Sequence, residues 1–137
     1  MPCRFAPKKA LIVAAGTDLV EIPRIQDLLR RRGPRFLERV YRPAERDYCM
    51  SRPRPAESLA ARFAAKEAVM KCLGTGWSDG VGFCDVEVTR NAAGAVGVAL
   101  HGKAAARSAR LGISRMHLSL SHTGDLALAF VVAVDDG

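Results

Sequence analysis

The sequence lacks the spaced cysteines and histidines of common metal and redox motifs. No C-x-x-C pair is present and no histidine lies at zinc-ligand spacing, which excludes a zinc finger and a thioredoxin-type site. Reduced and mostly buried thiols, as in the cytosol, are therefore expected for the four cysteines, which are Cys3, Cys49, Cys72 and Cys84.

Long apolar runs are also missing. The basic segment 1–9 followed by Ala10–Ala15 imitates a signal peptide, but this apolar run is short and Gly16 follows it directly. Leu126–Val134, the longest other run, has too few residues to cross a bilayer. We therefore predict a cytoplasmic protein with a basic N-terminal leader over residues 1–9 and no membrane partner.

Aromatic residues, linkers and internal repeats are scarce. Aromatic residues make up 6% of the chain, while hydrophobic residues make up 49% and charged residues 26%, which is typical of an ordinary globular protein rather than a disordered or coiled-coil one. No linker of domain-separating length interrupts the chain. The sequence therefore predicts a single domain over residues 10–137.

Acidic residues are outnumbered. The chain has 21 Lys and Arg against 14 Asp and Glu, which gives a net charge of +7. A surplus of this sign indicates an acidic partner, and nucleic acid, anionic lipid, a phosphorylated ligand and an acidic protein all remain open.

Extended patterns occur at both ends of the chain and in the middle. Ala10–Ala15 predicts a strand buried on both faces that delivers Asp18 at its C-terminal end. Alternating residues predict a hairpin of Cys84–Thr89 and Ala95–Leu100. A further strand is expected around residues 116–121, and the nearly all-apolar Leu126–Val134 is compatible with burial on both faces.

Helical patterns fill the rest. The longest predicted helix is alanine-rich and free of Gly and Pro, with Gly74 as its C-terminal cap. The predicted helices cover a segment opened by Pro23 and stopped at Gly33-Pro34, Arg35–Val40, a segment from Pro43, Glu57–Leu73, and Lys103–Leu111. The sum is an α+β fold, with a mainly antiparallel sheet packed with one long helix and several shorter helices.

The long helix carries charge where core is expected. Lys66 and Glu67 interrupt the apolar stripe of Leu59, Phe63, Met70 and Leu73. Glu67 and Lys71 share a face with Ala60 and Ala64, whose small side chains leave room for a ligand, although a solvated Glu67–Lys71 pair explains the pattern equally well.

A carboxylate at the end of an apolar strand is the second anomaly. Asp18 is costly to bury unless it pairs or binds a cation, and the plain alternative is that it caps the following helix. Together with Glu67, and with Lys66 and Lys71 nearby, it could hold Mg²⁺ against a phosphate-bearing ligand.

Two further segments could bind a ligand. Gly74-Thr75-Gly76 offers backbone N–H groups and a hydroxyl to a phosphate, although Gly74 also fits a plain helix cap. His122 lies among hydroxyl residues and is either structural or a contact for an anion or a proton. A serine hydrolase is discounted because G-x-S-x-G is absent.

Four segments in this order and spacing resemble the holo-[acyl-carrier-protein] synthase family of 4'-phosphopantetheinyl transferases. They are G-T-D-L-V-E-I-P-R-I from Gly16, A-R-F-A-A-K-E-A-V-M-K from Ala61, G-T-G from Gly74 and L-S-L-S-H-T from Leu118. R-F-A-A-K-E-A is the most specific of them. The resemblance covers about residues 12–134 and implies the transferase fold of that family.

The resemblance implies a reaction and a set of site residues. Members move the 4'-phosphopantetheine arm of coenzyme A to a serine of apo acyl carrier protein, release adenosine 3',5'-bisphosphate and need Mg²⁺. Asp18 and Glu67 would be metal ligands, and Glu67, Lys71 and His122 the catalytic residues. The coenzyme A site would contain Arg62, Lys71, Gly74, Thr75, Gly76, His122 and Thr123.

The resemblance also implies protein partners. Arg24, Arg35 and Phe36 match the region where the family binds its acidic carrier, and compact members are homotrimers with active sites between subunits. The competing hypothesis is a small basic nucleic-acid-binding module that uses the arginines between Arg24 and Arg54. It explains the charge but leaves Lys66, Glu67 and the Ser-His-Thr segment without a role.

Overall fold

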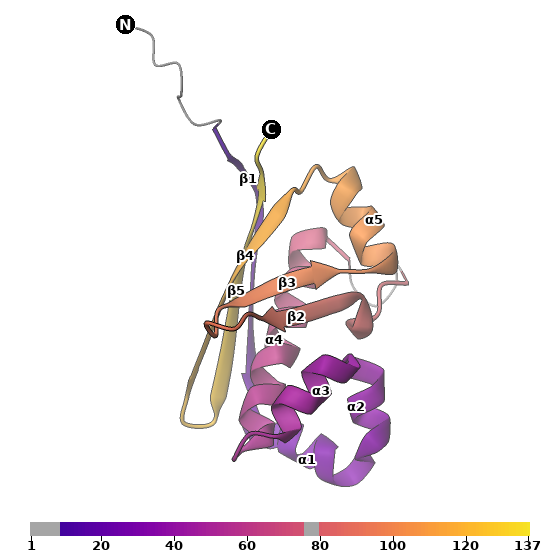
Figure 1. Cartoon of the computed structure of the whole chain (residues 1–137), viewed down its shortest axis with the longest axis vertical. Helices are drawn as coiled ribbons and strands as arrows, with labels where there is room; N and C mark the ends of the chain where they lie inside the picture. The colour runs from indigo at the N-terminus through magenta and orange to yellow at the C-terminus, as the bar shows by residue number, and fades with distance from the viewer. Residues whose placement is uncertain (1–8, 76–79) are drawn as a thin grey trace, which may run out of the picture.

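The computed structural model describes residues 9–75 and 80–137 (Figure 1). The predicted leader, apart from Lys9, and Gly76 lie outside these ranges. In chain order the elements are β1 (Leu11–Glu21), α1 (Ile22–Arg32), α2 (Pro34–Val40), α3 (Pro43–Met50), α4 (Pro55–Leu73), the 3-10 turn η2 (Phe83–Asp85), β2 (Val86–Arg90), β3 (Val96–Leu100), α5 (Gly102–Arg110), β4 (Arg115–Thr123) and β5 (Leu126–Asp135).

Two antiparallel sheets and the helices form an α+β fold, as predicted. The long strands pair in the order β1-β5-β4, while β2 and β3 form a separate hairpin. Helix α4 packs against β1 and β5, and α1 to α3 gather at one end of the molecule, with α5 at the other (Figure 1). Among the described helices, none has the length and apolar character needed to cross a membrane.

Helix α4 forms the centre of the core. Alanine is the best helix former and lets neighbouring backbones approach closely. Leu59, Phe63, Met70 and Leu73 are all buried, which confirms the predicted apolar stripe. The helix begins at Pro55 and ends at Leu73. Its C-cap is Gly74, whose positive φ of 66° is the left-handed conformation that glycine adopts without strain.

The predicted burial of the two terminal strands was wrong in one respect. The residues of β5 alternate, so that Ala127, Ala129 and Val131 are fully buried against α4, whereas Phe130 is 46% exposed. Strand β1 is also exposed on one side, with Ile12 at 73% exposure, and it continues past Asp18 to Glu21. An apolar run therefore does not by itself identify burial on both faces within one chain.

The remaining elements agree closely with those predicted from the sequence. Gly33 separates α1 from α2, and Asn91 accepts from the N–H of Gly94 in the hairpin turn. Cys84, predicted to begin a strand, lies instead in η2.

Candidate active site

Strand β1 and helix α4 bring Asp18 and Lys71 together. Lys71 Nζ donates to Asp18 Oδ1 at 3.2 Å and to the carbonyl of Thr17 at 2.7 Å. Asp18 does not cap the following helix, whose N-cap is Glu21 without a side-chain hydrogen bond. The capping hypothesis for Asp18 was therefore wrong, as was a simple Glu67–Lys71 pair, because Lys71 bonds across to β1.

Glu67 lies half-buried beside this pair. Burial raises the pKa of the Glu67 carboxyl, and the negative charge of Asp18 raises it further, while Arg24 and Lys71 act in the opposite direction. Two carboxylates close enough to repel each other form a donor set of the kind that a hard divalent cation neutralises. Within the described residues, no group of three or more metal-ligating side chains occurs.

Close approach of the two elements depends on Gly16. A Cβ atom there would collide with the backbone carbonyl of Ala68 and lie 3.1 Å from Cys72 Sγ. The alanine face of α4 is occupied by the protein itself, since Ala60 and Ala64 are also fully buried. The predicted room for a ligand beside Ala60 and Ala64 is therefore absent.

Lys66 does not belong to this cluster, contrary to prediction. It is fully buried and donates to Glu45 Oε1 at 2.8 Å, to the carbonyl of Phe83 at 3.1 Å, and to the carbonyl of Val86. Glu45 in turn accepts from the N–H groups of Arg42 and Val88. Lys66 thus joins α4 to α3 and the hairpin, while its neighbour Glu67 faces β1.

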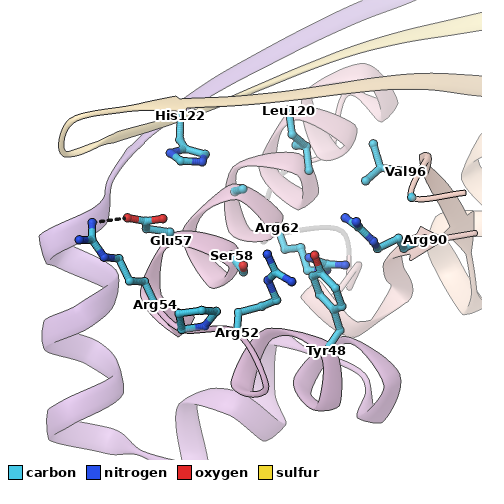
Figure 2. A pocket seen from close by; sticks show the side chains of 13 residues that line it. Tyr48, Arg52, Arg54, Glu57, Ser58, Arg62, Arg90, Val96, Leu120 and His122 are labelled. Carbon is cyan, nitrogen blue, oxygen red and sulfur yellow. Dashed lines mark hydrogen bonds and ion pairs between the residues drawn. The ribbon is translucent and has the colours of Figure 1, made fainter. Parts of the chain in front are cut away.

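An arginine-lined pocket lies farther toward the N-terminal end of α4 (Figure 2). Its volume is about 540 Å³. Arg62 lies with its guanidinium carbon 4.4 Å from the centre of the Tyr48 ring, and Arg90 lies at 4.9 Å from the same centre. Arg52 approaches the ring at 5.6 Å. Three cations around one ring form a site for a multiply charged anion.

Arg62 was predicted for an anionic ligand, but the rest of the pocket was missed. Arg62 is only 4% exposed, and its Nε has no hydrogen-bond partner among the described residues. Arg52 and Arg54 stand in a Pro- and Arg-rich loop that resembled an ordinary exposed turn, and Arg90 comes from the distant hairpin. The unusual density of arginine in that loop was the available signal.

His122 and Thr123 end strand β4 on the far side of this pocket. His122 is exposed and lines the pocket, extending from β4 toward α4 in Figure 2. The described contacts do not bring it to Glu67, so it stands with Arg62 rather than with the carboxylates. Arg62 and Glu67 are five residues apart on α4, which corresponds to about 7 Å along the helix axis.

The turn after α4 uses its backbone groups within the helix cap. The N–H of Gly74 donates to Lys71 O and that of Thr75 to Met70 O. These two donors are therefore not free to wrap a phosphate, which corrects that part of the prediction. Thr75 lies 7% exposed and lines a different cavity.

Helices α1 and α2 carry the three residues predicted for a carrier protein. Arg24 lies 5.7 Å from the centre of the Phe63 ring, close enough to Glu67 to lower the pKa of that carboxyl. Arg35 and Phe36 line a groove of about 780 Å³ together with Arg32 and Arg39. Phe36 is 6% exposed and packs edge-on against Tyr41, so it forms the floor of this groove rather than its rim.

The site can therefore hold a cation at two carboxylates, balance phosphate charge with Lys71, and bind a second anionic group at the arginine pocket. No described nucleophile stands between these groups. This arrangement suits transfer of a phosphoryl-linked group between two bound molecules, which is catalysed mainly by positioning and charge neutralisation.

Comparison with known proteins identifies the family. The profile of the 4'-phosphopantetheinyl transferase superfamily matches residues 14–131. A holo-[acyl-carrier-protein] synthase of Koribacter versatilis is 49% identical over 125 residues, which cover 91% of this chain and all of that protein.

Solved structures agree with the sequence relatives. The crystal structure of the Neisseria meningitidis holo-[acyl-carrier-protein] synthase matches with a TM-score of 0.80 and 38% identity, over 90% of this chain and 98% of that one. The Helicobacter pylori synthase in complex with coenzyme A matches with a TM-score of 0.77 and 30% identity, over 88% and 99% of the two chains. The chain therefore belongs to the 4'-phosphopantetheinyl transferase superfamily and, within it, to the holo-[acyl-carrier-protein] synthases.

Proposed function

We propose that this protein transfers the 4'-phosphopantetheine arm of coenzyme A to a serine of apo acyl carrier protein and releases adenosine 3',5'-bisphosphate. The observation that carries the proposal is the Asp18–Lys71–Glu67 cluster in a chain of this family. Family membership favours the transferase over the nucleic-acid-binding alternative. The cytoplasm is the proposed location.

The arginine pocket is the proposed site for the adenosine 3',5'-bisphosphate end of coenzyme A. The buried and unpartnered Nε of Arg62 supports this, because a buried donor without an acceptor is costly until a ligand supplies one. Arg52 and Arg90 would neutralise the 3'-phosphate, and the Tyr48 ring would be available to the base. His122 and Thr123 would close the pocket from β4, with the His122 ring as a proton donor to a phosphate oxygen.

The diphosphate and the pantetheine arm would extend along α4 toward Lys71. Lys71 is already fixed by Thr17 and Asp18, so its ammonium group needs no further ordering to meet a phosphate oxygen. Gly76 is the proposed backbone contact for the pantetheine arm, and Gly74 supplies the left-handed turn that leads the chain to it.

Asp18 and Glu67 are the proposed ligands of Mg²⁺. The fit rests on two carboxylates that repel each other and on the raised pKa of Glu67, which a cation would reverse. When bound, Mg²⁺ would neutralise charge on the diphosphate as the bond to phosphorus breaks. The residues supply carboxylate oxygens only, as this cation prefers.

The carrier serine oxygen forms a bond to the phosphorus next to pantetheine, and the bond from that phosphorus to the bridging diphosphate oxygen breaks. The electron pair leaves with adenosine 3',5'-bisphosphate. Glu67 accepts the serine proton as a general base, through a carboxylate oxygen that is not bound to the cation. Lys71 balances the charge that builds on the phosphate oxygens.

The carrier protein would bind over α1 and α2. Arg24 stands at the edge of the active site, and Arg35 lines the adjoining groove with Phe36 as its apolar floor. A basic surface of this kind attracts an acidic protein and orients it during approach. Arg24 would thereby place the carrier serine next to Glu67.

The experiment that tests the reaction is an intact-mass assay. Apo acyl carrier protein is incubated with this protein, coenzyme A and Mg²⁺, and a gain of one phosphopantetheine arm, roughly 340 Da, is expected. EDTA and Glu67→Ala should each abolish the gain. No gain with several apo carriers would contradict the proposed function.

The metal site has a test that does not depend on turnover. Mg²⁺ that binds the folded state should raise the Tm of the wild-type protein. Asp18→Asn should remove this rise. An equal rise in both proteins would show that the cation binds elsewhere.

A further inference from the structure

A second basic cavity lies between the end of α4 and helix α5, apart from the arginine pocket. Its volume is about 500 Å³, and Thr75, Val81, Lys103, Ala106, Arg107 and Arg110 line it. None of these residues lines the arginine pocket. Leu73, at the end of α4 beside this cavity, is eleven residues after Arg62, which corresponds to about 16 Å along the helix axis.

Three cations share the face of α5 that lines this cavity. Lys103, Arg107 and Arg110 follow each other at intervals of four and three residues, which places them side by side on a helix. Within the described residues, no carboxylate lines the cavity and none forms an ion pair with these three cations. Like charges at this spacing destabilise a helix, so their concentration at one cavity is unfavourable without an anion.

A hydrogen bond holds one of the cations in place, and a second cation lies against the backbone. Arg107 Nε donates to the carbonyl of Leu73 at 3.0 Å, which anchors its guanidinium at the end of α4. Residue 80 is a glycine, and a Cβ atom added to it would lie 2.7 Å from Lys103 Nζ. The absence of a side chain at Gly80 therefore allows the ammonium group to pack against the backbone. These contacts leave the remaining N–H groups of both side chains available.

An unpartnered hydroxyl completes the cavity. Thr75 is only 7% exposed, and its Oγ1 atom is buried and has no hydrogen-bond partner among the described residues. A buried hydroxyl without a partner is unusual in native proteins and indicates a missing ligand. Because Thr75 lines the cavity together with three cations, the site favours a ligand that accepts a hydrogen bond and carries negative charge.

We propose that Thr75, Lys103, Arg107 and Arg110 form a second anion site that binds a phosphate group independently of coenzyme A. A tetrahedral phosphate offers several acceptor oxygens and about two negative charges, which suit three cations and a hydroxyl better than a chloride ion would. The proposal concerns the α5 cavity alone and does not rest on the proposed function.

The plain alternative is that Arg107 and Arg110 only complement the negative end of the α5 dipole. Such a role needs neither Thr75 nor Lys103 and produces no phosphate site. Arg31 is a suitable comparison for Arg110, because it also lies in the last turn of a helix, α1. Unlike Arg110, it forms an ion pair with a carboxylate, that of Asp27.

The test is an NMR titration of the intact protein with inorganic phosphate at constant ionic strength, in the presence of saturating coenzyme A. The Thr75 amide and the Arg107 Nε–H signals should shift with a saturable curve, and chloride should not reproduce it. Thr75→Val and Arg110→Gln should each raise the phosphate Kd roughly tenfold, because each removes a hydrogen bond to a charged group. Arg31→Gln should leave the Kd unchanged.

Three outcomes would overturn the proposal. Shifts confined to Arg52, Arg62 or Arg90 would place phosphate in the arginine pocket. Loss of the Thr75 shifts on adding coenzyme A would make the cavity part of the coenzyme A site. An Arg110→Gln variant that binds phosphate as the wild type does would remove α5 from the site. None of these results depends on whether the protein transfers phosphopantetheine.

Discussion

Glu67 occupies a position that favours chemistry over stability. Burial and the Asp18 charge both raise the pKa of Glu67, so the ionised form is disfavoured in the folded protein. The same environment makes this carboxylate a stronger base than one in water. Residues at functional sites commonly carry such a cost, and replacing them often stabilises the fold.

Glu67→Gln should separate the effect of Glu67 on stability from its effect on turnover. Because the amide keeps the shape and loses the charge, the Tm measured without metal should be unchanged or higher. The turnover number in the intact-mass assay should fall at least about a hundredfold, as expected for loss of a general base. Glu87→Gln, on β2 and outside the carboxylate cluster and the proposed binding surfaces, is the matched control and should keep its turnover, since the amide can still bond His101. A Glu67→Gln variant with near wild-type turnover would remove Glu67 from proton transfer.

The buried Cys49 thiol should make the free energy of unfolding fall at alkaline pH. Burial raises the pKa of the Cys49 thiol from 9.0 to about 11. Between these values the unfolded chain has lost the thiol proton while the folded protein keeps it, so the free energy of unfolding falls as pH rises. Urea unfolding at pH 8 and pH 10 should show a smaller decrease for Cys49→Ser than for the wild type. Burial also raises the pKa of Tyr41 and Cys72 and lowers that of Lys66, and comparing the two proteins at each pH cancels these effects. Equal decreases would contradict the buried protonated thiol.

At the scale of elements, the contact between β1 and α4 positions the active site. Gly16 and Asp18 lie on the same strand, two residues apart, and Ala68 follows Glu67 directly on α4. The approach that needs a glycine is therefore adjacent to both carboxylates.

Gly16→Ala should weaken both stability and activity. The new methyl group would meet the backbone carbonyl of Ala68, which cannot move without shifting α4, so we expect a loss of about 1–3 kcal/mol in the free energy of unfolding. At a temperature where the variant stays folded, turnover should still decrease because Asp18 moves relative to Glu67. Gly82→Ala is the control, since nothing lies within 4 Å of its Cβ position, and it should be neutral or stabilising. Equal effects of the two changes would show that the close contact is not limiting.

The buried pair of Lys66 and Glu45 joins three elements and should be coupled energetically. Lys66→Met leaves Glu45 buried without its cation, which costs about 3–5 kcal/mol in the free energy of unfolding. The double variant with Glu45→Gln should recover a large part of that loss, because the amide is neutral and still accepts a backbone N–H. A double-mutant cycle by urea unfolding measures the coupling, with the exposed pair of Arg54 and Glu57 as a control near zero. Additive losses at Lys66 and Glu45 would contradict the coupling.

Local signals in the sequence predicted the elements well. Proline at helix starts, glycine at Gly33 and Gly74, and alternation in the hairpin all act through neighbouring residues, so they are visible without a structure. The pairing of Lys66 with Glu45 joins residues 21 positions apart and was missed, although Lys66 stood out as a charge in an apolar stripe. Arg90 was missed for the same reason, since only the fold brings the hairpin to α4.

For the whole molecule, the outer face of the long sheet is apolar and exposed. Leu19, Leu128 and Phe130 are 59%, 41% and 46% exposed on neighbouring strands, and Leu126 continues the same face. A contiguous apolar surface of this kind marks a protein interface. We propose that a second and a third copy of this chain cover it, in a homotrimer whose active sites lie between subunits.

Phe130→Glu should therefore separate the subunits. A charge at the centre of the apolar face is costly to bury, so light scattering should give about one chain mass instead of three times 14.7 kDa. Turnover should fall with trimer dissociation, whereas urea unfolding should show a monomer that still folds, because the α4 face of β5 is untouched. Ala44→Glu, an exposed change on α3 outside the long sheet, should keep both mass and turnover. A wild-type protein that is monomeric and fully active at assay concentration would show that the active site is complete within one chain.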